Sequence, residues 1–296
     1  ILINQWANVV RWEKVTRLFL RTTEFLWQEG HTCHRTLEEA QAETEKMLGV
    51  YKEFAENALA MPVIHGEKTD SEKFAGAQKT YTIEALMADG KALQAGTSHN
   101  LGQHFAKVFG IKFLDEDQSE KYVWQTSWGV STRLVGGVVM THGDDSGLML
   151  PPVIAPIQAV FVPIYFSSSL EAVNDKIREL GEKLSRFRVE LDLRETQTAG
   201  WKFNEWEMKG VPLRLEIGPR DIENNSCVLV SRPTREKAIV SLDNITDEVG
   251  RALGLVHNEL YSRAEQNLKS KTYDARSYAE FLDIAKSKPG YIRAMW

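Results

Sequence analysis

The sequence predicts an α/β protein of the α+β kind, in which an antiparallel sheet decorated with helices precedes an α/β domain with a mixed sheet. Segments rich in β-branched and aromatic residues, separated by turns, dominate residues 1–150. Strands alternate with helices over residues 151–270, and the change of pattern falls at Pro151-Pro152. The 296 residues, 43% hydrophobic and 26% charged, have a globular composition and suffice for two domains.

In the first half, residues 1–13 and 21–29 are rich in Trp, Val, Phe and Thr, which predicts two antiparallel strands around a basic loop at 14–19. Thr36 and Glu39 form a capping box, which predicts a helix that ends before Pro62. Further along, Asp89-Gly90 favours a hairpin between strands at 81–87 and 91–95. The remaining predictions are a helix over 101–109 closed by Gly110 and strands over 122–128 and 134–140.

In the second half, the patterns predict strands over 158–166, 187–193, 213–217, 228–231 and 238–242, and helices over 169–185, 201–209 and 247–269. This alternation indicates a compact domain over 151–270. The remaining segment, 271–296, is expected to be the start of a C-terminal extension.

Composition argues against several classes of protein. No run of ~18 apolar residues occurs, since the longest apolar stretch, 153–166, is interrupted by Pro156, Gln158 and Pro163, so we expect no membrane partner. A net charge of −5 argues against a protein that binds DNA through an overall positive charge. Cys33 and Cys227 lack metal spacing, and so do the histidines, so no metal ligand is assigned. The two cysteines do not support a disulfide framework, so we expect a cytoplasmic protein, and the N-terminus does not resemble a signal peptide.

Two arginines lie on the predicted strands that also carry large aromatic residues. Arg11 belongs to Asn8-Val9-Val10-Arg11-Trp12-Glu13, and Arg21 belongs to the segment from Phe19 to His31. Because a buried unpaired guanidinium is costly, each arginine should face either a carboxylate or a bound anion. The pattern alone leaves both possibilities open.

The second segment resembles motif 2 of the class II aminoacyl-tRNA synthetases. Its sequence is similar to that of prolyl-tRNA synthetases of the archaeal and eukaryotic type; it reads Arg21-Thr22-Thr23-Glu24-Phe25-Leu26-Trp27-Gln28-Glu29-Gly30-His31. The similarity continues through Lys73–Gly76, Gln94–Gln103, Ser127–Arg133 and His142–Asp144, so it covers essentially the whole chain. The resemblance implies a class II synthetase catalytic core running from motif 2 to motif 3 over residues 1–150, and an anticodon-binding domain over 151–270.

The resemblance also implies a proline–tRNA ligase that uses ATP and Mg²⁺ to make prolyl-adenylate and then charges proline tRNA. Two anions must approach each other in that reaction, so the site must supply fixed positive charge. By this resemblance Arg11 bridges the α-phosphate and the proline carboxylate, Arg21 holds the terminal phosphates, and Phe25 and Arg133 enclose adenine. Glu13, Thr22, Gln94 and Ser131 complete the implied ATP site, and no Mg²⁺ ligand can be named.

Proline needs an apolar wall beside groups for its carboxylate and ammonium. The resemblance places Trp27, Phe74 and His99 in that wall, with Arg11, Glu29 and Thr97 beside them. Without the resemblance, Trp27 and Phe74 would be ordinary core residues and His99 a loop histidine with satisfied hydrogen bonds.

In the second domain, Gly200–Asp221 carries four basic and four acidic residues, a balance that suits contacts with base edges better than contacts with phosphates. Proline anticodons contain two guanines, whose edges an arginine or a carboxylate can bind. The family's anticodon positions correspond to Glu207, Arg214, Arg220 and Asp221. The alternative is a solvated network of salt bridges.

Two alternative functions stay open: a catalytically silent paralogue that binds tRNA, and a class II synthetase for another amino acid such as threonine, glycine or histidine. The sequence begins after the region of motif 1 and of the Thr-x-Glu loop that clamps proline in this family. We therefore expect a piece of a longer protein that forms a homodimer partly through regions outside this chain.

Overall fold

The computed structural model describes residues 1–165 and 167–295, so the predicted positions of Phe166 in a strand and of Trp296 in the C-terminal extension lie outside the described residues. The chain forms two compact units. The first contains Ile1–Asn57, Met61–Thr141 and the chain from Asn267 onward, and the second contains Ala58–Ala60 and His142–Gln266. Each unit has its own sheet.

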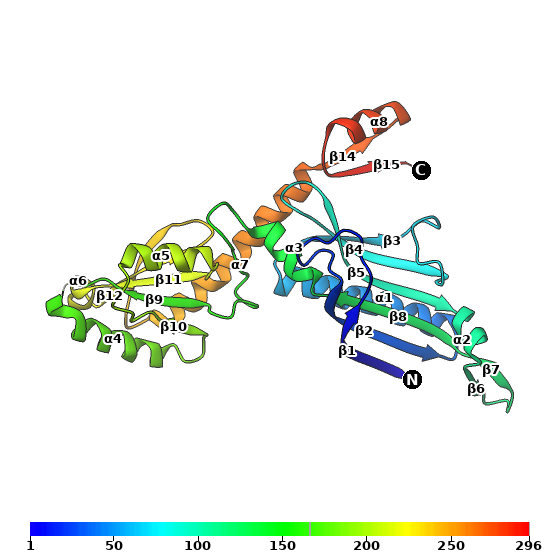
Figure 1. Cartoon of the computed structure of the whole chain (residues 1–296), viewed down its shortest axis with the longest axis horizontal. Helices are drawn as coiled ribbons and strands as arrows, with labels where there is room; N and C mark the ends of the chain where they lie inside the picture. Colours follow the sequence, from blue (N-terminus) through cyan, green and yellow to red (C-terminus); the bar gives the residue numbers. More distant parts are fainter. Residues whose placement is uncertain (166, 296) are drawn as a thin grey trace. The chain divides into compact units, whose positions relative to one another are not determined.

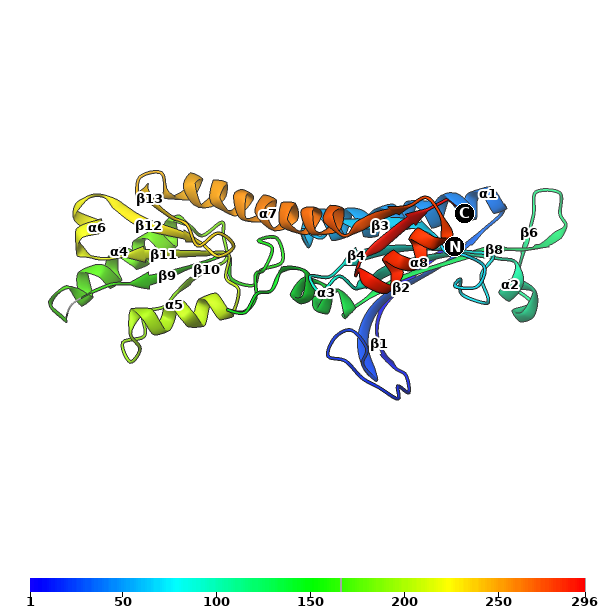
Figure 2. The ribbon, with the colours of Figure 1, turned by 90° about the horizontal axis from the view of Figure 1, so that it is seen from above.

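The first unit is built on a six-stranded antiparallel sheet in the order β1-β2-β8-β5-β4-β3. Its strands are β1 (Leu2–Val10), β2 (Glu24–His34), β3 (Val63–Glu67), β4 (Lys79–Leu86), β5 (Ala92–Gly102) and β8 (Trp124–Ser131). The predicted antiparallel sheet is confirmed. Figure 2 shows the loop between β1 and β2, in dark blue, extending away from the sheet.

One helix packs against a face of this sheet. Helix α1 (Leu37–Glu53) contacts β2, β4, β5 and β8, and a π-helical turn (Phe54–Ala58) follows it. The predicted helix start is confirmed, because the Thr36 side chain accepts a hydrogen bond from the backbone N–H of Glu39. The carboxylate of Glu39 accepts from the backbone N–H of Arg35 at 3.0 Å, one residue before the position that a capping box requires.

The hairpin at Asp89-Gly90 also forms as predicted. It joins β4 to β5, with Gly90 at a φ of +80°, and Asp89 accepts a hydrogen bond from the backbone of Lys91. The predicted helix over 101–109 is shorter in the structure, where α2 covers His104–Phe109 and Gly110 takes the left-handed conformation at its end. Residues 101 and 102 complete β5 instead.

The strand predicted over 134–140 is wrong, because this segment lies in helix α3 (Arg133–His142). Its valines suggested a strand, but burial repeats with a helical spacing: Leu134 and Val138 are buried, whereas Val135 and Val139 are exposed. A Cβ atom at Gly136 would approach the Leu20 side chain to 2.7 Å, so the glycine allows α3 to pack closely against the loop between β1 and β2.

Five strands and one helix of the first unit, among the residues that the structure describes, were not predicted. They are β3, β6 (Lys112–Leu114), β7 (Glu120–Tyr122), β14 (Thr272–Ala275), β15 (Tyr291–Ala294) and α8 (Tyr278–Ser287). The pair β14 and β15 is parallel, and β6 and β7 form a hairpin.

The second unit is the predicted mixed sheet, in the order β10-β9-β11-β12-β13. Strands β10, β9 and β11 are parallel, whereas β12 and β13 are antiparallel to their neighbours. The elements in chain order are β9 (Ala159–Pro163), a 3₁₀ turn (Ser167–Ser169), α4 (Leu170–Lys183), β10 (Val189–Leu191), α5 (Ala199–Met208), β11 (Leu213–Ile217), α6 (Pro219–Glu223), β12 (Ser226–Ser231), β13 (Lys237–Ser241) and α7 (Ile245–Ser270).

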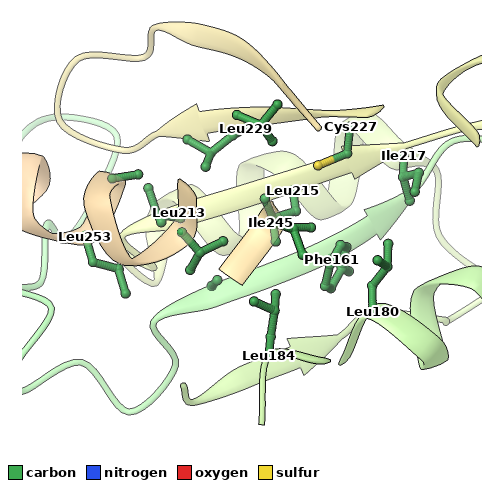
Figure 3. Packing of buried hydrophobic residues seen from close by; sticks show 14 of the residues in the cluster. Phe161, Leu180, Leu184, Leu213, Leu215, Ile217, Cys227, Leu229, Ile245 and Leu253 are labelled. Carbon is green, nitrogen blue, oxygen red and sulfur yellow. The ribbon is translucent and has the colours of Figure 1, made fainter. Parts of the chain in front are cut away.

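Helices cover both faces of this sheet. Phe161 of β9 packs with apolar residues of α4 and α7 in a large buried cluster (Figure 3), including Leu180 and Ile245. Val160 and Val162, on the other face of β9, pack with Trp206 of α5. Strand β9 is therefore buried on both sides, which explains its continuous apolar sequence.

Candidate active site and anticodon-side cavity

The face of the first sheet opposite α1 carries aligned polar side chains from three strands. Glu29 on β2 pairs with Gly129 on β8, and Gly129 pairs with Thr97 on β5. Two residues further along, Ser127 pairs with both His31 and His99. Because paired residues of neighbouring strands point to the same face, three strands that are distant in sequence contribute to one surface.

Two cavities that share four lining residues lie on this surface. The larger has a volume of about 380 Å³, and the smaller about 60 Å³. The larger contains Arg11, Phe25, Trp27, Glu29, Phe74, Gln94, Thr97, His99, Ser131 and Arg133 of the predicted site, and the smaller adds Glu13, Arg21 and Thr22. The structure therefore brings all the residues predicted for ATP and proline to one place.

Arg11 follows β1, and its side chain is exposed beside two aromatic rings. Its guanidinium carbon lies 5.5 Å from the centre of the Phe25 ring and 5.3 Å from the Trp27 ring, distances at which cation–π attraction acts. Within the part of the chain that the structure describes, Arg11 has no carboxylate partner. Its positive charge is therefore available to an anion in the cavity.

Arg21 differs from Arg11, because its Nε atom lies 3.1 Å from a carboxylate oxygen of Glu13. This ion pair matches the salt-bridge alternative. However, both side chains line the smaller cavity, and the Arg21 side chain is 62% exposed. The pair thus leaves guanidinium donors of Arg21 open to a second partner.

Arg133 begins α3 and holds two backbone segments of the site. Its Nε donates to the carbonyl of Leu20 at 2.9 Å, and one terminal nitrogen donates to the carbonyl of Gln94 at 3.4 Å. Burial, followed by the positive charges of Arg21 and Arg11, lowers the pKa of Arg133 from its ordinary value. Three guanidinium groups near one cavity repel each other, an arrangement that a bound polyanion would relieve.

Aromatic side chains form part of the wall of the larger cavity. Phe25 and Trp27 meet edge to face at 6.1 Å, and the half-exposed Phe74 lies 5.5 Å from the His99 ring. Glu29 lies among these walls and accepts a hydrogen bond from Gln5 at 3.2 Å. A small ligand with an apolar body and a positive group fits beside these side chains.

His99 is half-buried and neutral at physiological pH. Burial, and then the nearby positive charge of Lys68, lower its pKa to about 4, although Glu29 acts in the opposite direction. The side chain of Thr80 contacts its Nδ1 atom at 2.9 Å. His99 therefore adds polarity to the cavity without adding charge.

The sequence analysis missed residues that support this site. Lys68 donates to the side chain of Gln94 at 2.7 Å, and Thr80 contacts both His99 and the backbone of Phe74. Ser127 and Gly129 line the larger cavity. The quoted segment Ser127–Arg133 contained these last two, and alternation along β8 would have placed them on the same face as Ser131.

The four residues predicted for the anticodon do not gather at one cavity. Glu207 and Arg214 line a cavity of about 210 Å³ in the second unit. Arg220 and Asp221 lie in α6, beyond the other end of β11, and do not line it. Asp221 accepts a hydrogen bond from the backbone N–H of Gly218 at 2.8 Å, so its carboxylate also caps α6.

Paired charges surround this second cavity. Arg214 donates to Glu216 at 2.8 Å, and its guanidinium carbon lies 4.1 Å from the centre of the Phe203 ring. Glu207 lies 2.8 Å from a terminal nitrogen of Arg235. Three basic residues that were not predicted also line it, namely Arg232, Arg235 and Lys237. Planar guanidinium and phenyl groups beside carboxylates suit a planar ligand with donors and acceptors on its edge.

Two features are absent from the residues that the structure describes. Neither unit contains three or more His, Cys, Asp or Glu residues grouped closely enough to hold a metal ion. Among the helices described above, none is long and apolar enough to cross a membrane.

Comparison with known families agrees with the division into an antiparallel-sheet unit and a mixed-sheet unit. Residues 2–142 match the class II core domain of tRNA synthetases (G, H, P, S and T), and residues 153–251 match the anticodon binding domain. The two parts of the chain are thus similar to a class II tRNA synthetase core and to an anticodon binding domain, respectively. The antiparallel and mixed sheets are the folds expected of these two parts.

Individual proteins are similar over the whole chain. Proline–tRNA ligases from Alkaliphilus oremlandii and Natranaerobius thermophilus are 58% and 57% identical over 100% of this chain, and one from Clostridium novyi is 57% identical over 99%. The chain covers 61%, 62% and 61% of these relatives, respectively. It therefore spans about three fifths of the length of the curated relatives it matches.

Proposed function

We propose that this chain is part of a proline–tRNA ligase, which activates proline with ATP to prolyl-adenylate and transfers it to the 3′ end of proline tRNA. The observation that carries the proposal is the position of Arg11. Its guanidinium has no carboxylate partner among the described residues and lies beside Trp27 in a cavity shared with Glu29. One group can therefore reach both the anion of an amino acid and the phosphate that its carboxylate attacks.

In this proposal each of the three arginines binds a different part of ATP. Arg11 bridges the α-phosphate and the proline carboxylate, Arg21 holds the terminal phosphates, and Arg133 with Phe25 encloses adenine. Fixed positive charge cancels the repulsion between the carboxylate and the phosphate, and fixed geometry aligns them. Glu13, Thr22, Gln94 and Ser131 contribute polar contacts, consistent with their places in the two adjoining cavities.

Proline would occupy the larger cavity, between its aromatic side chains. Trp27, Phe74 and His99 would surround its ring, and Glu29 and Thr97 would lie near its secondary ammonium. A carboxylate at Glu29 favours the positive group, while the neutral state of His99 avoids repelling it.

We infer that the divalent metal is Mg²⁺ and that it binds mainly through ATP. The described residues provide no cluster of acidic ligands, and Mg²⁺ commonly keeps several waters while it binds substrate phosphates. It would neutralise part of the triphosphate charge. The arginines would supply the rest.

We propose that Glu207, Arg214, Arg220 and Asp221 contact the anticodon of proline tRNA. The two groups of residues lie near opposite ends of β11, so the anticodon bases would be splayed apart to reach both. Support comes from the cavity around Arg214 and Glu207, where the guanidinium and the Phe203 ring provide a stacking surface.

We also propose the following domain boundaries, oligomeric state, location and family type. The domain boundaries are 1–150, 151–270 and 271–296, the protein is a homodimer, and it is located in the cytoplasm. The archaeal and eukaryotic type is supported by the wording of Arg21–His31, whereas the relatives named above come from bacteria.

Two alternatives are less well supported. A silent tRNA-binding paralogue would not need Arg11, Arg21 and Arg133 around one cavity. A class II synthetase for another amino acid would fit the matched core, which groups several specificities, but the similar relatives are named proline–tRNA ligases.

The test is amino-acid-dependent exchange of pyrophosphate into ATP, measured with the full-length protein. Proline is expected to drive the exchange, because only an imino acid combines a small apolar ring with a secondary ammonium. Threonine, glycine and histidine serve as matched substrates. Exchange driven by one of them would change the assignment of the amino acid, and no exchange with any of them would favour the silent paralogue.

The anticodon assignment predicts a different result for Arg214→Ala. The variant should keep wild-type proline-dependent exchange, because Arg214 belongs to the second unit, whereas the residues proposed to contact the reacting groups belong to the first. Its charging of proline tRNA should fall about 10- to 100-fold, as expected for the loss of one or two contacts to a base. Equal losses in both assays would instead indicate misfolding. Arg251→Ala, an exposed arginine on α7, is the matched control.

A further inference from the structure

Thr80 makes a buried contact with the proposed proline site. It lies on β4, pairs directly with His99 on β5 and is 2% exposed. Its hydroxyl oxygen lies 2.9 Å from Nδ1 of His99 and 3.1 Å from the backbone nitrogen of Phe74. The Thr80 hydroxyl therefore contacts both Phe74 and His99, which are neighbours in the wall of the cavity.

The directions of these hydrogen bonds follow from the donors available. The backbone N–H of Phe74 can only donate, so the Thr80 oxygen accepts there. The single hydroxyl hydrogen still needs an acceptor, and Nδ1 of His99 is the acceptor that the described contacts offer. If Nδ1 carried a hydrogen, it would donate to the Thr80 oxygen, and the buried hydroxyl hydrogen would be left without an acceptor among the described contacts, at a cost of about 1–3 kcal/mol.

Neutral histidine carries one ring hydrogen, which must then be on Nε2. The charged groups that act on His99 are Lys68 and Glu29, and with burial they give a pKa of about 4. The ring is therefore neutral near pH 7. With Nδ1 engaged by Thr80, Nε2–H is the one polar group of the ring that remains for a ligand in the cavity.

We propose that Thr80 is a positioning residue that holds His99 in the Nε2–H tautomer, so that the pocket offers a fixed hydrogen-bond donor to a carboxylate oxygen of the bound amino acid. This inference rests on the proposed function, in which that amino acid is proline. A donor at Nε2 cannot accept from the ammonium, which leaves that group to Glu29. The hydrogen bonds that link Phe74, Thr80 and His99 thus leave His99 to bind the carboxylate of the amino acid and Glu29 to bind its ammonium.

Two substitutions distinguish this role from simple packing. In the full-length protein, Thr80→Val keeps the shape but removes the hydroxyl, whereas Thr80→Ser keeps the hydroxyl and removes a methyl group. We expect Thr80→Val to raise KM for proline in pyrophosphate exchange about 10-fold, the loss of about one hydrogen bond, with KM for ATP unchanged. Thr80→Ser should restore KM for proline. The reverse order, with Val active and Ser impaired, would overturn the proposal.

A second measurement observes the tautomer itself. In ¹⁵N NMR spectra of the full-length protein, with the signals of His99 assigned by comparison with His99→Gln, Nε2 should carry the hydrogen in the wild type and in Thr80→Ser. Thr80→Val should show loss of this single tautomer. A wild-type spectrum with the hydrogen on Nδ1 would refute the inference. Absence of proline-dependent exchange in the wild type would instead refute the proposed function, while the NMR result would still report on Thr80.

Discussion

Replacing Arg11 with alanine in the full-length protein is expected to lower kcat/KM for proline-dependent pyrophosphate exchange by about 100- to 1,000-fold. The loss corresponds to about 3–4 kcal/mol, the range found when one fixed donor to a developing charge is removed. Arg11 is well suited to this role, since its guanidinium lies over Phe25 and Trp27 and has no ion pair among the described residues. Removing it should leave the fold intact, because the side chain is exposed.

The matched control is Arg17→Ala. Arg17 is exposed in the same loop, and its described contacts to Arg21 are between backbone atoms, so the substitution removes an equal charge without entering either cavity. Exchange by this control should stay near the wild-type rate. Arg11→Lys should recover only part of the activity, because a lysine keeps the charge but cannot make two parallel hydrogen bonds. Near-normal exchange by Arg11→Ala would remove Arg11 from the proposed reaction.

Arg133→Ala is expected to act mainly on ATP. It removes one side of the proposed adenine site, worth roughly 0.5–2 kcal/mol, and two hydrogen bonds from a charged donor to the carbonyls of Leu20 and Gln94. We expect KM for ATP to rise about 30- to 100-fold, which corresponds to about 2–3 kcal/mol.

KM for proline is the internal control for this variant and should change much less. Arg133→Lys tests the geometry, because it keeps one positive charge but cannot donate to both carbonyls. It should therefore remain impaired. An ATP dependence identical to that of the wild type in Arg133→Ala would contradict the proposed adenine site.

Local patterns predicted most of the fold because local chemistry determined it. Asp89-Gly90 has the residues that a tight hairpin requires. The Thr36 side chain accepts a hydrogen bond from a backbone N–H in the first turn of α1, and this bond does not depend on what the helix packs against. The strand prediction for residues 134–140 was wrong because their conformation depends on tertiary packing instead of local sequence. Their valines favour a strand, but packing against Leu20 requires the close approach that Gly136 allows, and tertiary contact overrode local preference.

The site was predicted by motif and not by geometry. Residues inside the quoted motifs, such as Arg11 and His99, line the larger cavity of the structure. Lys68 and Thr80 lie outside those motifs, and their importance depends on which strands are neighbours, a property that no local pattern contains. The same limit applies to Arg220, whose separation from the cavity beside Arg214 depends on the path of β11.

The hydrogen bonds beneath α1 have a consequence for the opposite face of the sheet. Tyr51 donates to Gln28, and Ser98 donates to the carbonyl of Thr44, so the helix fixes which residues of β2 and β5 point toward it. A slip of one residue in β5 would turn Thr97 and His99 inward and expose Ser98 in their place. Substitutions in this buried layer would therefore change substrate affinity although none of these side chains touches a ligand.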